Sequence, residues 1–334
     1  MSSNAKQRLL AILFSGLALI PAAVAANTAQ RPDVQAFIDG VAQRHDFEAG
    51  ALRQLFQQVE IHPEIIEAME RPYEAKPWHQ YRPIFVTQAR MEEGAEFLRR
   101  HHSTLQRAEA KYGVPAEIIT AILGVESRYG RYRGKYRVLD SLATLGFDYP
   151  RRSKFFLQEL EAFLLLSREE QLDPLAITGS YAGAMGKPQF ISSSYRHYAV
   201  DFDGDGVRDL LDNNADAIGS VANYLARHGW QRNQPVAVPV RPAAEAPAVM
   251  DRLKRPDTEI RQWRQRGYIP DEPVSADLKA DLIVLENETG QEYWLGLQNF
   301  YAITRYNHSA LYAMAVYQLS QGIARQLPDT FSGL

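Results

Sequence analysis

The feature that most constrains this chain is the segment "VPAEIITAILGVE" at residues 114–126, in which most side chains are apolar. Pro115 suits a first helical turn and Gly130 suits the position just past a helix end, so the sequence predicts a helix over 115–128. Ile122 and Leu123 precede Glu126 by four and three positions, as Ile119 does by seven. This spacing puts Glu126 on the apolar stripe, which must face the core or the wall of a cleft.

A carboxylate on that stripe has unusual chemistry. Removal from water raises the pKa of a carboxyl group, and the negative end of the helix dipole also disfavours its ionised form. Glu126 is therefore a candidate general acid that keeps its proton near neutral pH. The alternative is a structural ion pair with a nearby cation, for which Arg128, Arg131 and Arg133 are candidates. The sequence leaves both interpretations open.

The rest of the chain is mostly of helical character. Apolar residues recur with helical spacing between 32 and 70, a long charged helix is expected over 88–112, and another over 215–229. The segment 71–85 is too rich in proline for a regular helix, and the first half of 177–195 reads as loop. Residues 231–296 form a candidate small β-rich insert, with two strands about "NETGQ", before helix returns over 297–334. The fold class expected is mainly α (α+β).

Composition and the N-terminus limit where the protein works. A formal net charge of −3 argues against nucleic acid as a partner. Residues 1–26 read as a signal peptide, with Lys6 and Arg8 before a short apolar run and cleavage after Ala25 or Ala26. With no cysteine, the chain has neither a disulfide nor a lipidation site. We expect a soluble periplasmic protein with no transmembrane segment after cleavage.

The sequence "DFDGDGVRDLLD" at 201–212 fits the calcium-binding loop of an EF-hand. Gly206 supplies the sharp turn, and the positions that offer oxygen ligands are Asp201, Asp203, Asp205, Val207 through its carbonyl, Asp209 and Asp212. An EF-hand usually ends in a bidentate Glu, and Asp212 is shorter. We expect a structural Ca²⁺ that stabilises the following helix, with an acidic turn that binds no ion as the alternative.

Five motifs in order identify a family resemblance. They are "GVESRYG", "LDSLATLGFDYPRR", "GSYAGAMGKPQF", "DFDGDG" with "DAIGSVANY", and "FYAITRYNHSALYAMAV". Together they closely resemble the membrane-bound lytic murein transglycosylase B family, from about residue 76 to 319. The resemblance implies a lysozyme-like helical core over 111–230 with an EF-hand-like loop at 201–216, flanked by a helical N-terminal region over 27–110 and by the small β-containing insert.

The family resemblance also implies an activity. It is the cleavage of the β-1,4 bond between N-acetylmuramic acid (MurNAc) and N-acetylglucosamine (GlcNAc) in peptidoglycan, which leaves 1,6-anhydroMurNAc ends. The implied catalytic residue is Glu126, acting first as acid and then as base. Substrate contacts are implied for Ser180, Gln189, Tyr81, Tyr224, Tyr306, Asn307 and Tyr312. The family closes its calcium loop with a later aspartate that aligns with Asp216, so Asp212 and Asp216 remain alternatives. Glycan strands are the expected partner, and other cell-wall enzymes are further candidates.

The sequence leaves two rival functions open. A hydrolytic muramidase would need a second carboxylate to activate water, for which Asp140, Asp148 and Glu161 are candidates. A non-catalytic, calcium-dependent scaffold that binds peptidoglycan would keep the tyrosines and need no acid. The nature of the cleaved ends separates the first rival from a transglycosylase, and the effect of Glu126→Gln on cleavage and binding separates the second.

Overall fold

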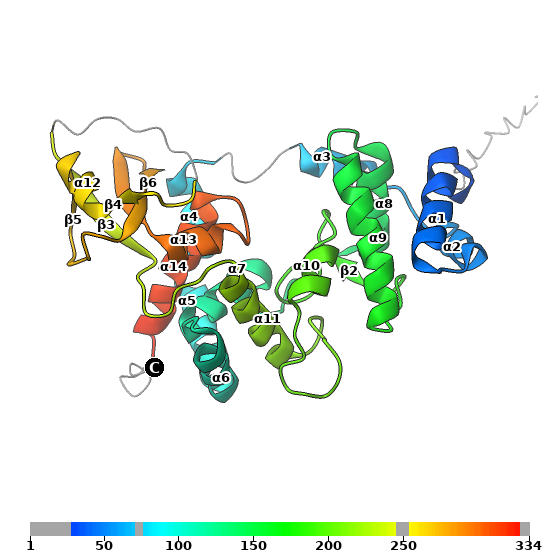
Figure 1. Cartoon of the computed structure of the whole chain (residues 1–334), viewed down its shortest axis with the longest axis horizontal. Coiled ribbons are helices and arrows are strands. Elements are labelled where there is room, and N and C mark those ends of the chain that lie inside the picture. Colours follow the sequence, from blue (N-terminus) through cyan, green and yellow to red (C-terminus); the bar gives the residue numbers. More distant parts are fainter. Residues whose placement is uncertain (1–27, 71–75, 245–253, 328–334) are drawn as a thin grey trace, which may run out of the picture. The chain divides into compact units, whose positions relative to one another are not determined.

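The computed structural model describes residues 28–70, 76–244 and 254–327, so the segment expected to be a signal peptide lies outside the described residues (Figure 1). The described chain falls into two units, one ending at Gln57 and one beginning at Gln58. Among the described helices, none combines the length and the apolar character needed to cross a membrane.

The first unit is a small group of helices. A 3₁₀ turn, η1 (Thr28–Gln30), precedes α1 (Pro32–His45) and α2 (Ala49–Phe56). The helical spacing predicted from residue 32 is confirmed, since Val34, Ile38 and Val41 are all buried. The side chain of Glu48 caps α2 by accepting hydrogen bonds from the backbone N–H groups of Gly50 and Ala51.

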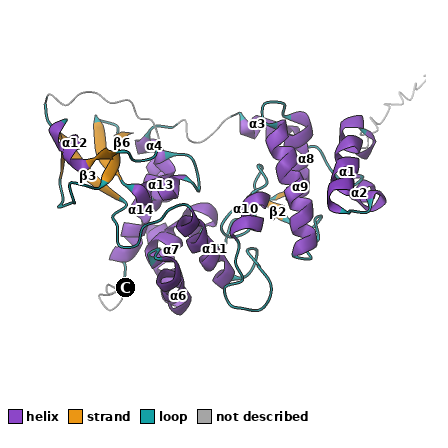
Figure 2. Cartoon of the chain, viewed as in Figure 1, coloured by secondary structure: helices purple, strands orange, loops and turns teal. Residues whose placement is uncertain are grey.

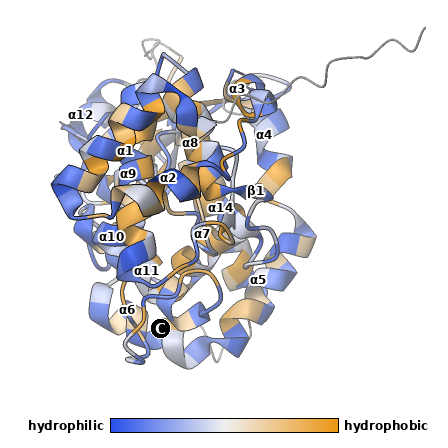
Figure 3. Cartoon of the chain, turned by 90° about the vertical axis from the view of Figure 1, so that its right-hand side faces the viewer, coloured by the Kyte–Doolittle hydropathy of each residue, from blue (hydrophilic) through white to orange (hydrophobic). Residues whose placement is uncertain are grey.

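The second unit is built mainly from helices (Figure 2). These helices are α3 (Pro63–Met69), α4 (Trp78–Phe85), α5 (Gln88–Arg100), α6 (His102–Tyr112), α7 (Ala116–Ser127), α8 (Val138–Asp148), α9 (Ser153–Glu169), α10 (Ser192–Tyr198), α11 (Asn214–Arg227), α12 (Ile260–Gln265), α13 (Gln298–Thr304) and α14 (Ala310–Arg325). Helix α7 is central, because α5, α6, α11 and α14 all pack against it. Outer helices such as α5 and α6 carry both hydrophilic and hydrophobic residues (Figure 3).

Helix α7 confirms the helix predicted over 115–128. Pro115 is its N-cap residue, and Arg128 ends the helix in the left-handed conformation. Every residue from Ala116 to Val125 is buried except Glu117. A helix surrounded by four others needs apolar side chains on nearly all of its surface, which is what the sequence supplies.

Two of the predicted boundaries are wrong. Residues 78–85 form α4 although Pro83 lies inside it, while 71–75 lie outside the described residues. Burial of Trp78 and Tyr81, at about 1.5–3 kcal/mol each, offsets the roughly 3 kcal/mol cost of an interior proline. The single helix expected over 88–112 is two helices, because the backbone of His101 leaves the helical region between α5 and α6.

The β-rich insert contains a five-stranded antiparallel sheet. Its order is β4 (Thr258–Glu259), β6 (Lys279–Glu286), β7 (Gln291–Gly296), β3 (Ala237–Pro242) and β5 (Tyr268–Pro270). Strands β6 and β7 pair about "NETGQ", which confirms the predicted hairpin. Ile260 and Trp263 of α12 pack on the sheet and give the insert a core of its own. A second, two-stranded sheet pairs β1 (Tyr136–Arg137) with β2 (Thr178–Gly179) and so fixes the start of the loop between β2 and α10.

Candidate active site

Glu126 is the penultimate residue of α7, and its side chain is half-buried. The hydroxyl of Tyr312, in the first turn of α14, donates a hydrogen bond to Oε1 of Glu126 over 2.5 Å. Burial raises the pKa of Glu126 from 4.5 to about 7, and the bond from Tyr312 opposes this rise only in part. At neutral pH the site therefore holds comparable amounts of the acid and the carboxylate, as a group that donates and later accepts a proton requires.

The structure contradicts the alternative in which Glu126 forms an ion pair with a neighbouring arginine. Arg128 makes a two-pronged ion pair with Glu93 of α5, with both N–O distances at 2.7 Å, and Arg131 binds the same carboxylate at 2.8 Å. Arg133 instead binds Asp212 at 2.7 Å. All three candidate cations are thus held by other carboxylates, and among the described residues no positive charge counteracts the effect of burial on the pKa of Glu126.

The end of α7 that carries Glu126 is anchored on two sides. On the α5 side, the Arg90 guanidinium donates a hydrogen bond to the carbonyl of Gly124, one of the last carbonyls of the helix. The Tyr129 hydroxyl donates to the carbonyl of Arg90 over 2.7 Å. On the other side, Ser127 Oγ donates to the carbonyl of Lys187 over 2.6 Å. These bonds fix the position of the helix end that carries Glu126.

Three of the predicted tyrosines come together beside Glu126. The rings of Tyr224 and Tyr306 lie 4.8 Å apart, and those of Tyr306 and Tyr312 are parallel at 6.4 Å. Tyr306 donates its hydroxyl proton to the carbonyl of Pro188 over 2.6 Å, and Tyr224 donates to that of Arg305 over 2.5 Å. Burial raises the pKa values of all three phenols, and the proximity of Glu126 raises them further. Segments far apart in the sequence thus form one wall with the carboxyl group.

The loop between β2 and α10 contributes Ser180 and Gln189. Ser180 Oγ accepts hydrogen bonds from the backbone of Ala184 and Ala182, at 3.0 and 3.3 Å, and so closes a tight turn. Gln189 has a positive φ of 50°, which is strained for a residue other than glycine. Its amide donates to the carbonyls of Arg133 and Gly186, at 3.2 and 2.8 Å. The loop is therefore held in one shape.

A cavity of about 460 Å³ lies against this wall, and Gln189, Tyr224 and Tyr306 are among the residues that line it. Sequence reasoning did not select two of its other residues, His228 and Arg305. Both are next to predicted positions: the ring of His228 stacks on Tyr224 at 4.0 Å, and Arg305 directly precedes Tyr306. His228 lies at the end of α11 and Arg305 at the end of α13, and no sequence motif at either position indicates a binding residue.

The remaining two predicted substrate residues, Tyr81 and Asn307, do not line this cavity. Tyr81 is only 2% exposed and packs against Trp78 and Phe85 in α4, so its ring offers no open face. Asn307 is half-buried in the turn between α13 and α14, where its carbonyl accepts a hydrogen bond from the N–H of Ser309 over 2.7 Å.

The loop at 201–216 brings together three carboxylates. One oxygen from each of Asp201, Asp203 and Asp205 lies within 4.8 Å of the others at the surface. Asp201 also accepts hydrogen bonds from the N–H groups of Gly204, Asp205 and Gly206, which shape the loop around it. Oxygen ligands grouped in this way suit a hard cation such as Ca²⁺.

The other predicted calcium ligands have different partners. Asp212 is exposed and binds Arg133. Asp216 is fully buried and accepts hydrogen bonds from the N–H groups of Phe202 and Asp209, at 2.7 and 2.8 Å, so it ties the two ends of the loop together. Asp209 likewise accepts bonds from the backbone of residues 211 and 212, and Val207 is exposed in the loop.

Comparison with known proteins identifies the class. The family model of the transglycosylase SLT domain matches residues 29–321. The chain therefore belongs to this family, and its resemblance to the lytic murein transglycosylases B is confirmed. It is 45% identical over 306 residues to "Membrane-bound lytic murein transglycosylase B" of Escherichia coli (strain K12), covering 89% of this chain and 84% of that protein.

Solved structures agree with this assignment. SltB1 of Pseudomonas aeruginosa, a lytic transglycosylase, is 48% identical with a TM-score of 0.84, and covers 89% of this chain and 99% of its own. Lytic transglycosylase Slt35 of Escherichia coli, solved with calcium, is 45% identical with a TM-score of 0.83, covering 89% and 94%. SltB3 of Pseudomonas aeruginosa, solved with NAG-anhNAM-pentapeptide, is 32% identical with a TM-score of 0.76, covering 90% and 79%. The predicted lysozyme-like, mainly helical fold is confirmed.

Proposed function

We propose that this enzyme of the lytic transglycosylase family cleaves the β-1,4 bond between MurNAc and GlcNAc in peptidoglycan and leaves 1,6-anhydroMurNAc ends. The observation that carries the proposal is the single carboxyl group of Glu126, with a pKa raised to about 7 beside a wall of tyrosines. The anhydro sugar in the SltB3 complex supports the same product here.

In the proposed mechanism one carboxyl group acts twice. Protonated Glu126 donates its proton to the glycosidic oxygen as the bond from C1 to that oxygen breaks, and GlcNAc leaves with a free 4-hydroxyl. The 2-acetamido group of MurNAc stabilises the positive charge at C1. The Glu126 carboxylate then removes the proton of the 6-hydroxyl as O6 attacks C1, which closes the anhydro ring and restores the acid.

Tyr312 serves both steps in this mechanism. Its hydroxyl orients the carboxyl group towards the cleft and stabilises the carboxylate formed in the first step. Tyr306, the half-buried member of the wall, and Gln189 line the adjoining cavity, where they contact the glycan. Tyr224 lines the same cavity, Ser180 closes the turn of the loop that carries Gln189, and Tyr81 lies close to Tyr312. Asn307 directly follows Tyr306 in the same turn.

The hydrolytic alternative is less well supported. Asp140 is almost fully buried, binds Arg137 at 2.6 Å and accepts a hydrogen bond from the N–H of Glu60, so it does not face a substrate. No carboxylate among the described residues contributes to the pKa of Glu126, as one placed close by for a two-carboxylate mechanism would. We therefore favour internal attack by the 6-hydroxyl over attack by water.

Calcium is part of the same proposal. Asp201, Asp203 and Asp205 hold Ca²⁺, while Asp209, Asp212, Asp216 and the carbonyl of Val207 complete or shape the loop. Slt35 with calcium is the precedent. The ion has a structural role, because it lies at the entry to α11, which carries Tyr224. Export by a signal peptide cleaved after Ala25 or Ala26 would bring the enzyme to the periplasm, where its substrate lies.

The test is digestion of purified sacculi by the wild type and by Glu126→Gln, followed by mass spectrometry of the released fragments. Anhydro ends from the wild type alone support the proposal. Reducing ends from the wild type would identify a hydrolase. No product from either protein, with binding to sacculi unchanged, would identify a scaffold. Glu117→Gln, on the same helix, is the matched control and should cleave like the wild type.

A further inference from the structure

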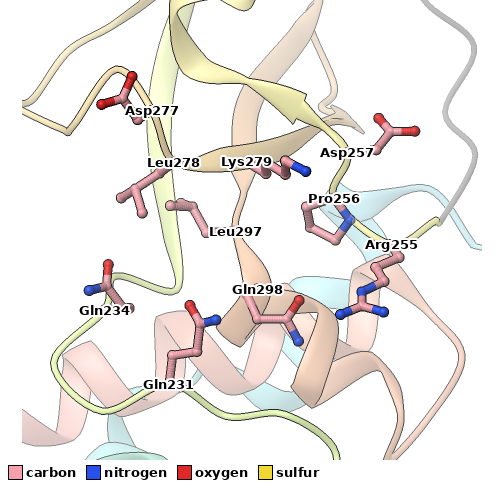
Figure 4. Close-up of a pocket in the computed structure, with 10 residues that line it drawn as sticks. All are labelled: Gln231, Gln234, Arg255, Pro256, Asp257, Asp277, Leu278, Lys279, Leu297 and Gln298. Carbon is pink, nitrogen blue, oxygen red and sulfur yellow. The ribbon is translucent and has the colours of Figure 1, made fainter.

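A second polar cavity of about 490 Å³ lies between the β-rich insert and the helical core, away from Glu126 (Figure 4). One side is formed by Gln231, Gln234 and Gln298, next to α11 and α13. The facing side is formed by Arg255 to Asp257 and by Asp277 to Lys279 of the insert.

The helical side of this cavity is rigid. The fully buried side chain of Asn299 binds the backbone of Gln231 in both directions, at 2.7 and 2.8 Å, and donates to the carbonyl of Gln234 over 2.7 Å. Gln298 donates to the carbonyl of Gly229 over 3.1 Å. These hydrogen bonds fix the backbone that carries Gln231 and Gln234 and the position of the Gln298 side chain.

The charges of the facing side are unbalanced. Asp257 is paired with Lys254, and Asp277 with Arg261, each at 3.1 Å. Arg255 and Lys279 form no ion pair with any residue that the structure describes. Figure 4 shows the guanidinium of Arg255 beside the side chain of Gln298, with Lys279 on the strand above them. Lys279 lies opposite Glu259 in the β4–β6 pair and, after Arg261, helps to lower the pKa of Glu259 without forming an ion pair with it. Two exposed cations next to an amide favour an anionic ligand.

The lining also indicates the class of ligand. The cavity has no aromatic residue, whereas sugar rings are commonly held on aromatic faces such as those beside Glu126. Instead it combines amide side chains, which suit peptide groups, with the apolar side chains of Leu278 and Leu297. Peptide bonds, small apolar side chains and free carboxylates occur together in the peptide stem that peptidoglycan carries on its muramic acid.

The cavity is within reach of a substrate in the cleft. His228 lines the cavity beside the tyrosine wall and Gln231 lines this one, so the two linings are only three positions, at most about 11 Å of chain, apart. An extended pentapeptide spans about 16 Å. A stem attached to a sugar beside Tyr306 is therefore long enough to enter this cavity.

We propose that this cavity binds the carboxylate-bearing peptide stem of the peptidoglycan strand, with Arg255 and Lys279 as its anion contacts. The inference rests on the proposed function, because it assumes a peptidoglycan substrate in the cleft. It adds a subsite that favours strands with peptide over strands stripped of it.

The test is calorimetric titration with NAG-anhNAM-pentapeptide, with the same ligand whose carboxylates are amidated, and with NAG-anhNAM alone. The double variant Arg255→Gln with Lys279→Gln should bind the pentapeptide ligand about three- to tenfold more weakly, as expected for two partly exposed ion pairs. Its affinity for the other two ligands should be unchanged. The matched control is Arg241→Gln with Arg264→Gln, two exposed cations of the insert outside the cavity.

Equal affinity of the double variant and the wild type for the pentapeptide ligand would overturn the inference, as would an equal loss for NAG-anhNAM alone. Raising the salt concentration with the unmodified protein gives a second test, because the pentapeptide ligand with free carboxylates should lose affinity more steeply than its amidated form. These titrations require no cleavage, so digestion of sacculi reports separately on the proposed function.

Discussion

Tyr312→Phe isolates the hydrogen bond that adjusts the acidity of Glu126. The substitution removes one oxygen and leaves the ring, which is 3% exposed and parallel to that of Tyr306. Because the bond stabilises the carboxylate, its loss raises the pKa of Glu126 further. A hydrogen bond to a charged group contributes about 1.5–3 kcal/mol, and 1.36 kcal/mol corresponds to one pKa unit. Since Glu126 is half-buried and water replaces part of the bond, we expect the lower limit, a rise from about 7 to about 8.

The assay is the pH dependence of kcat/KM for the release of fragments from cell wall. Where protonated Glu126 acts first, activity falls as pH rises through its pKa, so the alkaline limb of the Tyr312→Phe profile should lie about one pH unit higher. Tyr306→Phe is the matched control, because that hydroxyl donates to Pro188 and not to Glu126. An alkaline limb that stays in place, or that moves to lower pH, would refute the assignment of this limb to Glu126.

Three further outcomes are expected. Native Glu126, with a pKa of about 7, binds more protons than the unfolded chain between pH 4.5 and 7, so this group lowers stability as pH rises through that window, by at most about 3 kcal/mol. Glu126→Gln should remove that slope in urea unfolding measured from pH 4 to 8. EDTA should lower the Tm of the wild type, added Ca²⁺ should restore it, and Asp203→Asn should show a smaller response. Leu123→Ala, in the core of α7, should cost about 2–5 kcal/mol in urea unfolding, and a loss below 1 kcal/mol would contradict the central position of α7.

The sequence predicts the elements whose pattern is local. The apolar stripe of α7 and the hairpin about "NETGQ" depend on side chains a few residues apart, and both are confirmed. The stripe alone also isolated Glu126. Helix α4 is not predicted because a proline inside a segment argues against a helix when only neighbouring residues are considered. The burial of Trp78, which stabilises this helix, depends on the tertiary structure.

The partners of the site could not be predicted in this way. Tyr312 lies 186 residues from Glu126, and nothing near either residue indicates that their side chains meet. Spacing made Arg128 and Arg131 equally good partners for Glu126. Their actual partner, Glu93, is 35 and 38 residues upstream, where it reads as one of several charges on an exposed helix. Which carboxylate each arginine binds is decided by the packing of α5 against α7, which the local sequence does not reveal.

The acidity of Glu126 therefore depends on residues that never touch it. A guanidinium close to a carboxylate lowers its pKa, and three arginines follow Glu126 within seven positions. Glu93 holds two of them against α5 and Asp212 holds the third, and the same contacts anchor the end of α7. These ion pairs hold the three guanidinium groups on other carboxylates, and burial is the main influence on the pKa of Glu126. A surface salt bridge of this kind contributes little to stability, so its effect on a catalytic pKa is the stronger reason for its position.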